Sequence, residues 1–263
     1  MKKRVISAIV MLAIVLPAIF LSEISRILLL LVAGILCTWE FCNGFKKQKN
    51  INCASIVLYV HLIAQAAIVL FDRSIEYNII CFVIAMFSAF ACGIFDHNIQ
   101  GEGTVASLAG LVYPGFIFTT VMFVGKSDIW FITIIMACIS TWVCDSFAMF
   151  GGKWFGKHKL APSVSPNKTV EGTLSGALFS MLAGLILYLT GVCSPLTLLE
   201  CVLIALIASS MGQIGDLAES LLKRMLDLKD FSNLIPGHGG VFDRCDSLLF
   251  SIPTAYLLIS ILM

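Results

Sequence analysis

Residues 129–150 read IWFITIIMACISTWVCDSFAMF, an apolar stretch whose single charged residue is Asp145. A helix needs about 20 mostly apolar residues to cross the hydrocarbon core of a bilayer. The stretch therefore predicts a transmembrane helix, and similar stretches recur along the chain. Together they predict an all-α polytopic membrane protein of about nine spans, at 5–21, 27–45, 51–71, 78–95, 104–125, 129–150, 173–193, 197–215 and 246–262.

The composition of the 263-residue chain agrees with a membrane protein. Hydrophobic residues make up 59% of it and charged residues only 13%, whereas a soluble domain is about 25% charged. So little charge excludes a soluble enzyme, a disordered chain and a nucleic-acid-binding protein with a basic surface. The net charge of +1 says nothing about partners.

The basic start, Lys2-Lys3-Arg4, followed by the apolar residues 5–21 resembles a signal peptide. No small-x-small cleavage site follows Leu21, so we expect a retained first helix. The ten cysteines include no C-x-x-C pair. They therefore indicate neither a zinc site nor a thioredoxin-type motif, and we expect them to pack as small apolar side chains.

The basic residues predict the orientation of the spans, because cytoplasmic loops carry an excess of Lys and Arg. With the N-terminus inside, 14 of the 17 Lys and Arg fall in cytoplasmic segments, and only Arg26, Arg73 and Lys126 fall outside. We expect one integral membrane domain, 1–263, with cytoplasmic catalytic loops in its second half, about 129–263. A short chain without organelle signals fits a bacterial inner membrane, with the site facing the cytoplasm.

Nearly half of the charged residues lie in two segments, 145–171 and 216–246, which make up about a fifth of the chain. In the first segment, Asp145 lies about five residues before the end of its span. An acid at that depth is costly and by default suggests a functional site. The alternative is a structural ion pair with a nearby lysine.

Gly151–Lys157 fits the G-x-x-x-x-G-K pattern of a phosphate-binding P-loop. However, His158 stands where Ser or Thr should hold magnesium, and the pattern follows an expected transmembrane helix rather than a strand. A nucleotide-binding P-loop is therefore not predicted.

The loop continues as PSVSPNKTVEG over residues 162–172. Its hydroxyls, amide and lysine sit on a backbone that two prolines restrict. Such a loop can surround phosphate oxygens with donors, ahead of a helix whose N-terminal N–H groups add more. A plain helix N-cap by Ser165 or Thr169 is the alternative.

The second segment begins where the span at 197–215 ends. If the helix continues, Asp216, Glu219 and Lys223 share one face. An amphipathic helix lying on the headgroups would explain the basic residues Lys223 and Arg224. It would not explain Asp216, which sits at the membrane boundary.

Residues 236–246 read PGHGGVFDRCD and run directly into the last span. Three glycines around His238 let the backbone approach a ligand closely, although His238 could equally be a hydrogen-bonded loop residue. Asp243 and Asp246 are three residues apart and face the same way at a helix N-terminus. With Asp216 they predict a magnesium site, since magnesium is usually held by one or two carboxylates plus substrate phosphates and waters.

The pattern S-x-L-K-R-x4-K-D-x-S-x2-I-P-x-H-G-G-V-x-D-R-C-D over 220–246 resembles the signature of phosphatidate cytidylyltransferases (CDP-diacylglycerol synthases). Cys245 is a departure, since the family usually has an aliphatic residue, Phe or Thr there. Upstream, the S-P-x-K-T-x-E-G run of 165–172 also resembles the family's cytoplasmic loop.

The resemblance implies transfer of the cytidylyl group of CTP to phosphatidate, giving pyrophosphate and CDP-diacylglycerol. It also implies magnesium dependence and a homodimer in the bilayer. It carries Asp216 and Asp243 over as metal ligands, with Asp246 as a third. A two-metal arrangement, with a second ion, could hold the attacking oxygen and the leaving pyrophosphate in line. We predict that Lys168 joins Asp216 and Asp243 as a catalytic residue, and that the substrates contact Asp145, Ser163, Ser165, Thr169, Lys223, Arg224, His238 and Arg244.

The expected chemistry agrees with these residue types. The attacking group is itself a phosphate, so no protein nucleophile or covalent intermediate is required. The obstacle is charge repulsion, because two unit charges about 4 Å apart interact by about 4 kcal/mol at an effective dielectric of 20. Metal ions together with Lys and Arg would offset it.

Two alternatives remain. A transporter or channel would use the acids as an ion path, but transporters often carry their charges at mid-membrane, whereas these acids lie at the cytoplasmic ends of spans. A related CTP-using enzyme would act on a polyprenol or an archaeal-type lipid instead of phosphatidate.

Overall fold

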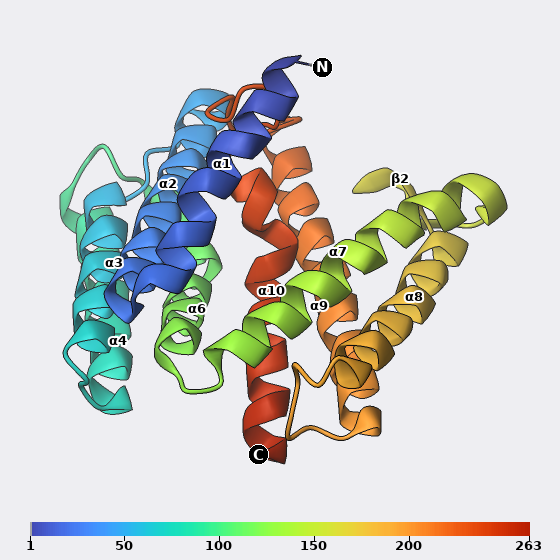
Figure 1. Ribbon diagram of the computed structural model, residues 1–263. Coiled ribbons are helices and arrows are strands. Elements are labelled where there is room, and N and C mark those ends of the chain that lie inside the picture. The colour runs from blue at the N-terminus through green and yellow to red at the C-terminus, as the bar shows by residue number, and fades with distance from the viewer. Residues whose placement is uncertain (1) are drawn as a thin grey trace. The chain divides into compact units, whose positions relative to one another are not determined.

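The computed structural model describes residues 2–263, except for the side chains of residues 2–5 and 75. The side chains of the basic residues 2–4, which we expect inside the cell, thus lie outside the described part. Helices dominate the chain (Figure 1). The elements are α1 (Lys2–Leu21), α2 (Glu23–Lys49), α3 (Ser55–Leu70), α4 (Ile75–Phe95), α5 (Gly101–Gly110), the π-helix η1 (Leu111–Phe116), α6 (Ile117–Lys126), α7 (Trp130–Phe155), β1 (Lys159–Ala161), β2 (Ser165–Thr169), α8 (Val170–Leu189), α9 (Leu198–Met225) and α10 (Phe242–Leu262).

Seven helical segments in the described chain are long and apolar enough to cross a membrane. Two further apolar helices, Ile6–Leu21 and Ser55–Leu70, are shorter. Each of the nine predicted spans coincides with one of these segments, so the prediction of a helical membrane protein is confirmed. The number of spans, nine, stays a prediction.

The chain divides into two compact units. One comprises the residues up to Lys126 together with Met225–Arg244, and the other comprises Ser127–Arg224 and Cys245–Met263. Both units combine distant parts of the sequence. The prediction of a single domain over 1–263 stays a prediction.

In the first unit, α2 packs against α1, α3 and α6, and these helices lie side by side in Figure 1. Its core contains the fully buried side chains of Phe41, Leu62 and Met122. The predicted span at 104–125 is interrupted, because Tyr113 has non-helical backbone angles (φ −135°, ψ 108°) ahead of Pro114. Proline cannot donate a helical hydrogen bond and clashes with the preceding turn, which accounts for the break.

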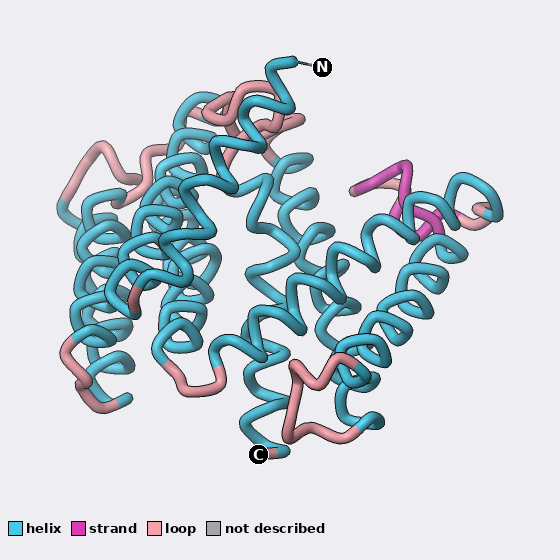
Figure 2. Tube along the Cα trace, in the orientation of Figure 1, coloured by secondary structure: helices cyan, strands magenta, loops and turns pink. Residues whose placement is uncertain are grey.

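In the second unit, the second half of α7 packs against the first part of α8. A β-carbon at Gly176 would lie 2.6 Å from the carbonyl oxygen of Cys144, so this glycine allows the close approach. The antiparallel strands β1 and β2 form the connection between the two helices (Figure 2). A β-carbon at Gly184 would lie 2.6 Å from the carbonyl oxygen of Cys201, which brings α9 equally close to α8.

Three of the helices that extend beyond the predicted spans bear on the candidate site. Helix α7 continues through the glycines at 151 and 152 to Phe155, because Gly151 packs against Ser175 of α8. Helix α9 continues to Met225, as the shared face of Asp216, Glu219 and Lys223 requires. Helix α10 begins at Phe242 and so includes Asp243.

Candidate functional site

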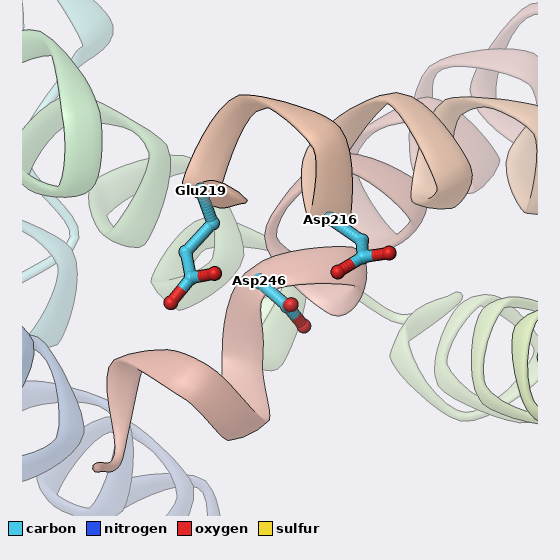
Figure 3. Close-up of side chains that lie close together, drawn as sticks. All are labelled: Asp216, Glu219 and Asp246. Carbon is cyan, nitrogen blue, oxygen red and sulfur yellow. The ribbon is translucent and has the colours of Figure 1, made fainter. Parts of the chain in front are cut away.

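Three acids of the second unit converge. Asp216 and Glu219 project from one face of α9, and Asp246 reaches toward them from α10 (Figure 3). One carboxylate oxygen from each side chain lies within 4.8 Å of the other two. The sequence predicts Asp216 and Asp246 as partners, and the structure adds Glu219, which we did not predict as a ligand. We call Asp216, Glu219 and Asp246 the carboxylate cluster.

Close contact between α9 and α10 brings the cluster together. A β-carbon at Gly215 would lie 2.5 Å from the carbonyl oxygen of Asp246 and 2.9 Å from the ring of Phe250. One turn earlier, a β-carbon at Gly212 would lie 3.0 Å from the methyl group of Thr141. Glycine at position 215 therefore allows the backbone of α10 to pass beside Asp216.

Two lysines flank the carboxylate cluster. Lys168 forms an ion pair with Asp216, and its ammonium also donates to the carbonyl oxygen of Gln213 at 3.4 Å. Lys223 forms an ion pair with the fully buried Glu219 one turn before it on α9. Burying a carboxylate is costly unless it is paired, so Lys223 explains how Glu219 is tolerated. The cluster with its two lysines carries a formal charge of −1.

The β1–β2 hairpin positions Lys168, which lies in β2. The hairpin is held at both ends. The Nε of Arg224 on α9 donates to the carbonyl oxygen of Val164 at 3.1 Å. The Glu171 carboxylate accepts the N–H of Lys157 at 3.0 Å and contacts the His158 ring at 2.6 Å. The segment expected to be a phosphate-binding loop is thus partly a short sheet.

The hydroxyl groups of this segment differ in their contacts. Thr169 is the N-cap of α8, and its side chain accepts the N–H of Gly172 at 3.1 Å. This is the structural alternative named for it above. Ser163 is exposed and Ser165 half-buried. Substrate contacts by these three residues stay predictions.

Asp145 lies on α7 in the same unit, with an exposed side chain. The alternative interpretation was a structural ion pair with a nearby lysine. Among the residues that the structure describes, no ion pair to Asp145 is found. Its predicted contact with substrate stays a prediction.

Residues 220–224 and 245–246 of the signature belong to the second unit, and residues 225–244 belong to the first. The Asp243 carboxylate there is buried and accepts the N–H groups of Phe231 at 3.1 Å and Gly240 at 2.8 Å through the same oxygen, Oδ2. Asp243 therefore organises the loop that precedes it. Its predicted role as a metal ligand is a separate matter and stays a prediction.

The other two candidates, His238 in this loop and Arg244 in the first turn of α10, have different surroundings. The Nδ1 of His238 lies 2.9 Å from the Ser7 hydroxyl, which also donates to the carbonyl oxygen of Pro236 at 3.1 Å. His238 is thus hydrogen-bonded within the protein, and its predicted contact with substrate stays a prediction. The side chain of Arg244 is exposed.

Sequence reasoning missed Glu40, which lies on α2 and contacts the same loop. Its carboxylate is fully buried and accepts the N–H groups of Val241 and Phe242. The missed signal is an acid inside an otherwise apolar predicted span, the observation that singled out Asp145.

Seven long apolar helices and a lysine-flanked carboxylate cluster define a helical membrane protein with a site suited to cations and phosphates. The comparison with known families is more specific. A model described as "Cytidylyltransferase family" matches residues 2–262. The chain therefore belongs to the cytidylyltransferase family and is a nucleotidyltransferase enzyme.

Curated relatives match over nearly the full length. The phosphatidate cytidylyltransferase of Bacillus subtilis (strain 168) is 31% identical over 267 residues, which cover 99% of this chain and 98% of the relative. The phosphatidate cytidylyltransferase of Brucella abortus biovar 1 (strain 9-941) is 32% identical, covering 98% and 92%. That of Staphylococcus haemolyticus (strain JCSC1435) is 28% identical, covering 98% and 99%.

Proposed function

We propose that this enzyme transfers the cytidylyl group of CTP to phosphatidate, giving CDP-diacylglycerol and pyrophosphate in phospholipid biosynthesis. The observation that carries the proposal is the lysine-flanked carboxylate cluster, in a chain whose full-length relatives are named phosphatidate cytidylyltransferases. A reaction between two anionic substrates needs a site with this combination of charges.

The cluster fits a magnesium ion. Magnesium prefers oxygen ligands and is usually held by one or two carboxylates together with substrate phosphates and waters. Asp216, Glu219 and Asp246 offer three carboxylates within reach of one another. When bound there, the ion would supply positive charge that offsets repulsion between the triphosphate and the lipid phosphate. A second ion, if bound, would be held mainly by the substrate phosphates.

The protein's own cations would share that task. Lys168 pairs with Asp216 and lies on the hairpin that we expect to face the triphosphate. When CTP binds, its phosphate oxygens would become new partners of the Lys168 ammonium group. Lys223, Arg224 and Arg244 would neutralise charge near the headgroup. Because the phosphatidate phosphate is the attacking group, these residues bind and orient, and no covalent enzyme intermediate forms.

The proposed topology has nine spans, seven of them long helices and two the shorter Ile6–Leu21 and Ser55–Leu70. The N-terminus and both charged segments would face the cytoplasm, where CTP is, in a bacterial inner membrane. We further propose a homodimer. Reporter fusions after Lys49 and Lys126 test the topology. The first should report the cytoplasm and the second the outside.

The function is tested by incubating purified protein with CTP, magnesium and an equimolar mixture of phosphatidate, a polyprenyl phosphate and an archaeal-type lipid phosphate. We expect CDP-diacylglycerol as the product. A CDP-linked product of either competing lipid in its place would reassign the substrate. Ion flux through proteoliposomes without CTP, combined with no CDP-lipid, would favour a transporter.

A further inference from the structure

We propose that Glu40 is a positioning residue that holds the loop 231–241 and the start of α10 in the arrangement that cytidylyl transfer requires. The inference rests on the proposed function. Glu40 lies in the second half of α2 (Glu23–Lys49), about 200 residues before the groups that it contacts.

Glu40 is held by three hydrogen bonds. Its Oε1 accepts the N–H of Val241 at 2.9 Å and the hydroxyl of Ser232 at 2.5 Å, while its Oε2 accepts the N–H of Phe242 at 2.7 Å. The side chain has no exposed surface. Both carboxylate oxygens therefore accept hydrogen bonds from the loop or from the start of α10, and the side chain is shielded from solvent.

The contacts supply a cap that α10 lacks locally. The first N–H groups of a helix have no partner within it, and Ser, Thr, Asp or Asn usually caps them from the residue before the helix. Here that residue is Val241, which has no polar side-chain atom. Glu40 takes over the capping role from a different helix.

Asp243 completes the arrangement. Its carboxylate accepts the N–H of Gly240, so the N–H groups of three consecutive residues, 240–242, all point to protein carboxylates. A helix N-terminus is otherwise a ready site for a phosphate. At the start of α10 the carboxylates of Asp243 and Glu40 accept these N–H groups. These N–H groups therefore orient the chain and are not offered to a substrate phosphate.

The Glu40 carboxylate fills the space that a side chain at position 240 would need. A β-carbon at Gly240 would lie 2.5 and 2.6 Å from the two oxygens of Glu40. Gly237 and Gly239 have positive φ angles, but Gly240 is not among the positive-φ glycines. Glycine is therefore needed at position 240 for space, and the space is filled by the Glu40 carboxylate.

This arrangement is suited to positioning more than to stability. Burying a carboxylate away from water carries a desolvation cost, and a local Ser or Asp at position 241 would cap α10 without that cost. A carboxylate that joins α2, Ser232 and the start of α10 does something a local cap cannot. It fixes the loop of the signature and the first turn of the helix that carries Arg244 and Asp246.

The test is Glu40→Gln, which keeps the shape and removes the charge, with Glu23→Gln as the matched control on the same helix. For Glu40→Gln we expect kcat per folded molecule to fall about 10- to 100-fold, the range that a misplacement of about 1 Å produces, with the KM for CTP nearly unchanged. We also expect amide hydrogen exchange to accelerate in 231–242 and to stay at the wild-type rate in Leu198–Gly215 of α9. Glu23→Gln should change neither.

The close packing of the Glu40 carboxylate against Gly240 allows a second test. This test can be used even if Glu40→Gln does not fold. Gly240→Ala should lower kcat and accelerate exchange in 231–242. Shortening the acid in the same chain, as Gly240→Ala with Glu40→Asp, should restore part of both. Wild-type kcat and exchange in Glu40→Gln, or a defect of Gly240→Ala that Glu40→Asp does not relieve, would overturn the proposal. If the wild-type protein transfers no cytidylyl group, the proposed function fails, while the exchange measurements still decide whether Glu40 holds the loop.

Discussion

Replacing Asp246 by asparagine removes one negative charge from the carboxylate cluster and keeps the shape of the side chain. The amide oxygen can still accept the N–H of Ser247, which the carboxylate now accepts at 2.7 Å. The variant should therefore fold, and its principal defect should be weaker binding of a divalent cation. We expect this defect in the free enzyme, before any nucleotide is added.

The magnitude follows from the spacing and exposure of the cluster. A divalent ion and a unit charge about 4 Å apart interact by about 8 kcal/mol at an effective dielectric of 20. Asp246 is half-buried and the asparagine oxygen can still coordinate the ion, so we take roughly a quarter of this value, about 2 kcal/mol, to allow for screening by solvent and for the remaining ligand. Because 1.4 kcal/mol corresponds to a factor of ten in Kd, we expect Asp246→Asn to weaken Mn²⁺ or Mg²⁺ binding about 30-fold.

The assay is titration of the detergent-purified protein with Mn²⁺, followed by electron paramagnetic resonance of the free ion. Asp227→Asn is the matched control, because it removes an acid whose side chain is 75% exposed and pairs with Lys49. The control should bind Mn²⁺ like the wild type. Wild-type affinity in Asp246→Asn would refute the assignment of the cluster as a cation site.

Three further predictions test other parts of the site. Lys168→Met removes the cation paired with Asp216. In the Mn²⁺ titration without CTP the variant should bind the ion more tightly, and in steady-state kinetics its KM for CTP should rise. Weaker Mn²⁺ binding together with a lower KM for CTP would contradict the role proposed for Lys168. Asp243→Asn keeps an oxygen for the N–H groups of Phe231 and Gly240, so the protein should stay folded and inserted while transfer of label from CTP to lipid is lost; wild-type turnover would exclude Asp243 as a catalytic residue. Gly215→Ala places a methyl group against Asp246 and Phe250 and should lower stability by about 1–3 kcal/mol, seen as a lower Tm in detergent, whereas Gly101→Ala, where nothing lies within 4 Å, should leave the Tm near the wild-type value.

Hydropathy predicts the helices of this chain well, because each span must be apolar over a length set by the bilayer. It places the helix ends less well. The two glycines at 151 and 152 suggest a helix end, yet α7 continues to Phe155 because α8 packs closely against Gly151. Similarly, Pro162 and Pro166 suggest an irregular loop, while Ser165–Thr169 pairs with Lys159–Ala161 as a strand.

The site was also only partly predictable, because contacts between distant segments decide which residues come together. Asp216 and Asp246 stood out because they lie where apolar spans begin or end. Glu219 resembles one polar residue of an amphipathic helix until α10 places Asp246 beside it. Glu40 has its partners about 200 residues away, and local patterns carry no information about such contacts.

The central claim, cytidylyl transfer, is tested most directly by the position of the label in CTP. Purified protein in phosphatidate-containing micelles with magnesium is given CTP labelled either at the α-phosphorus or at the γ-phosphorus, and the lipid and pyrophosphate fractions are separated. The account predicts that α-label appears in the lipid, in equal amount to the pyrophosphate formed, and that γ-label appears only in pyrophosphate. Entry of γ-label into the lipid, or no α-label there, would contradict it.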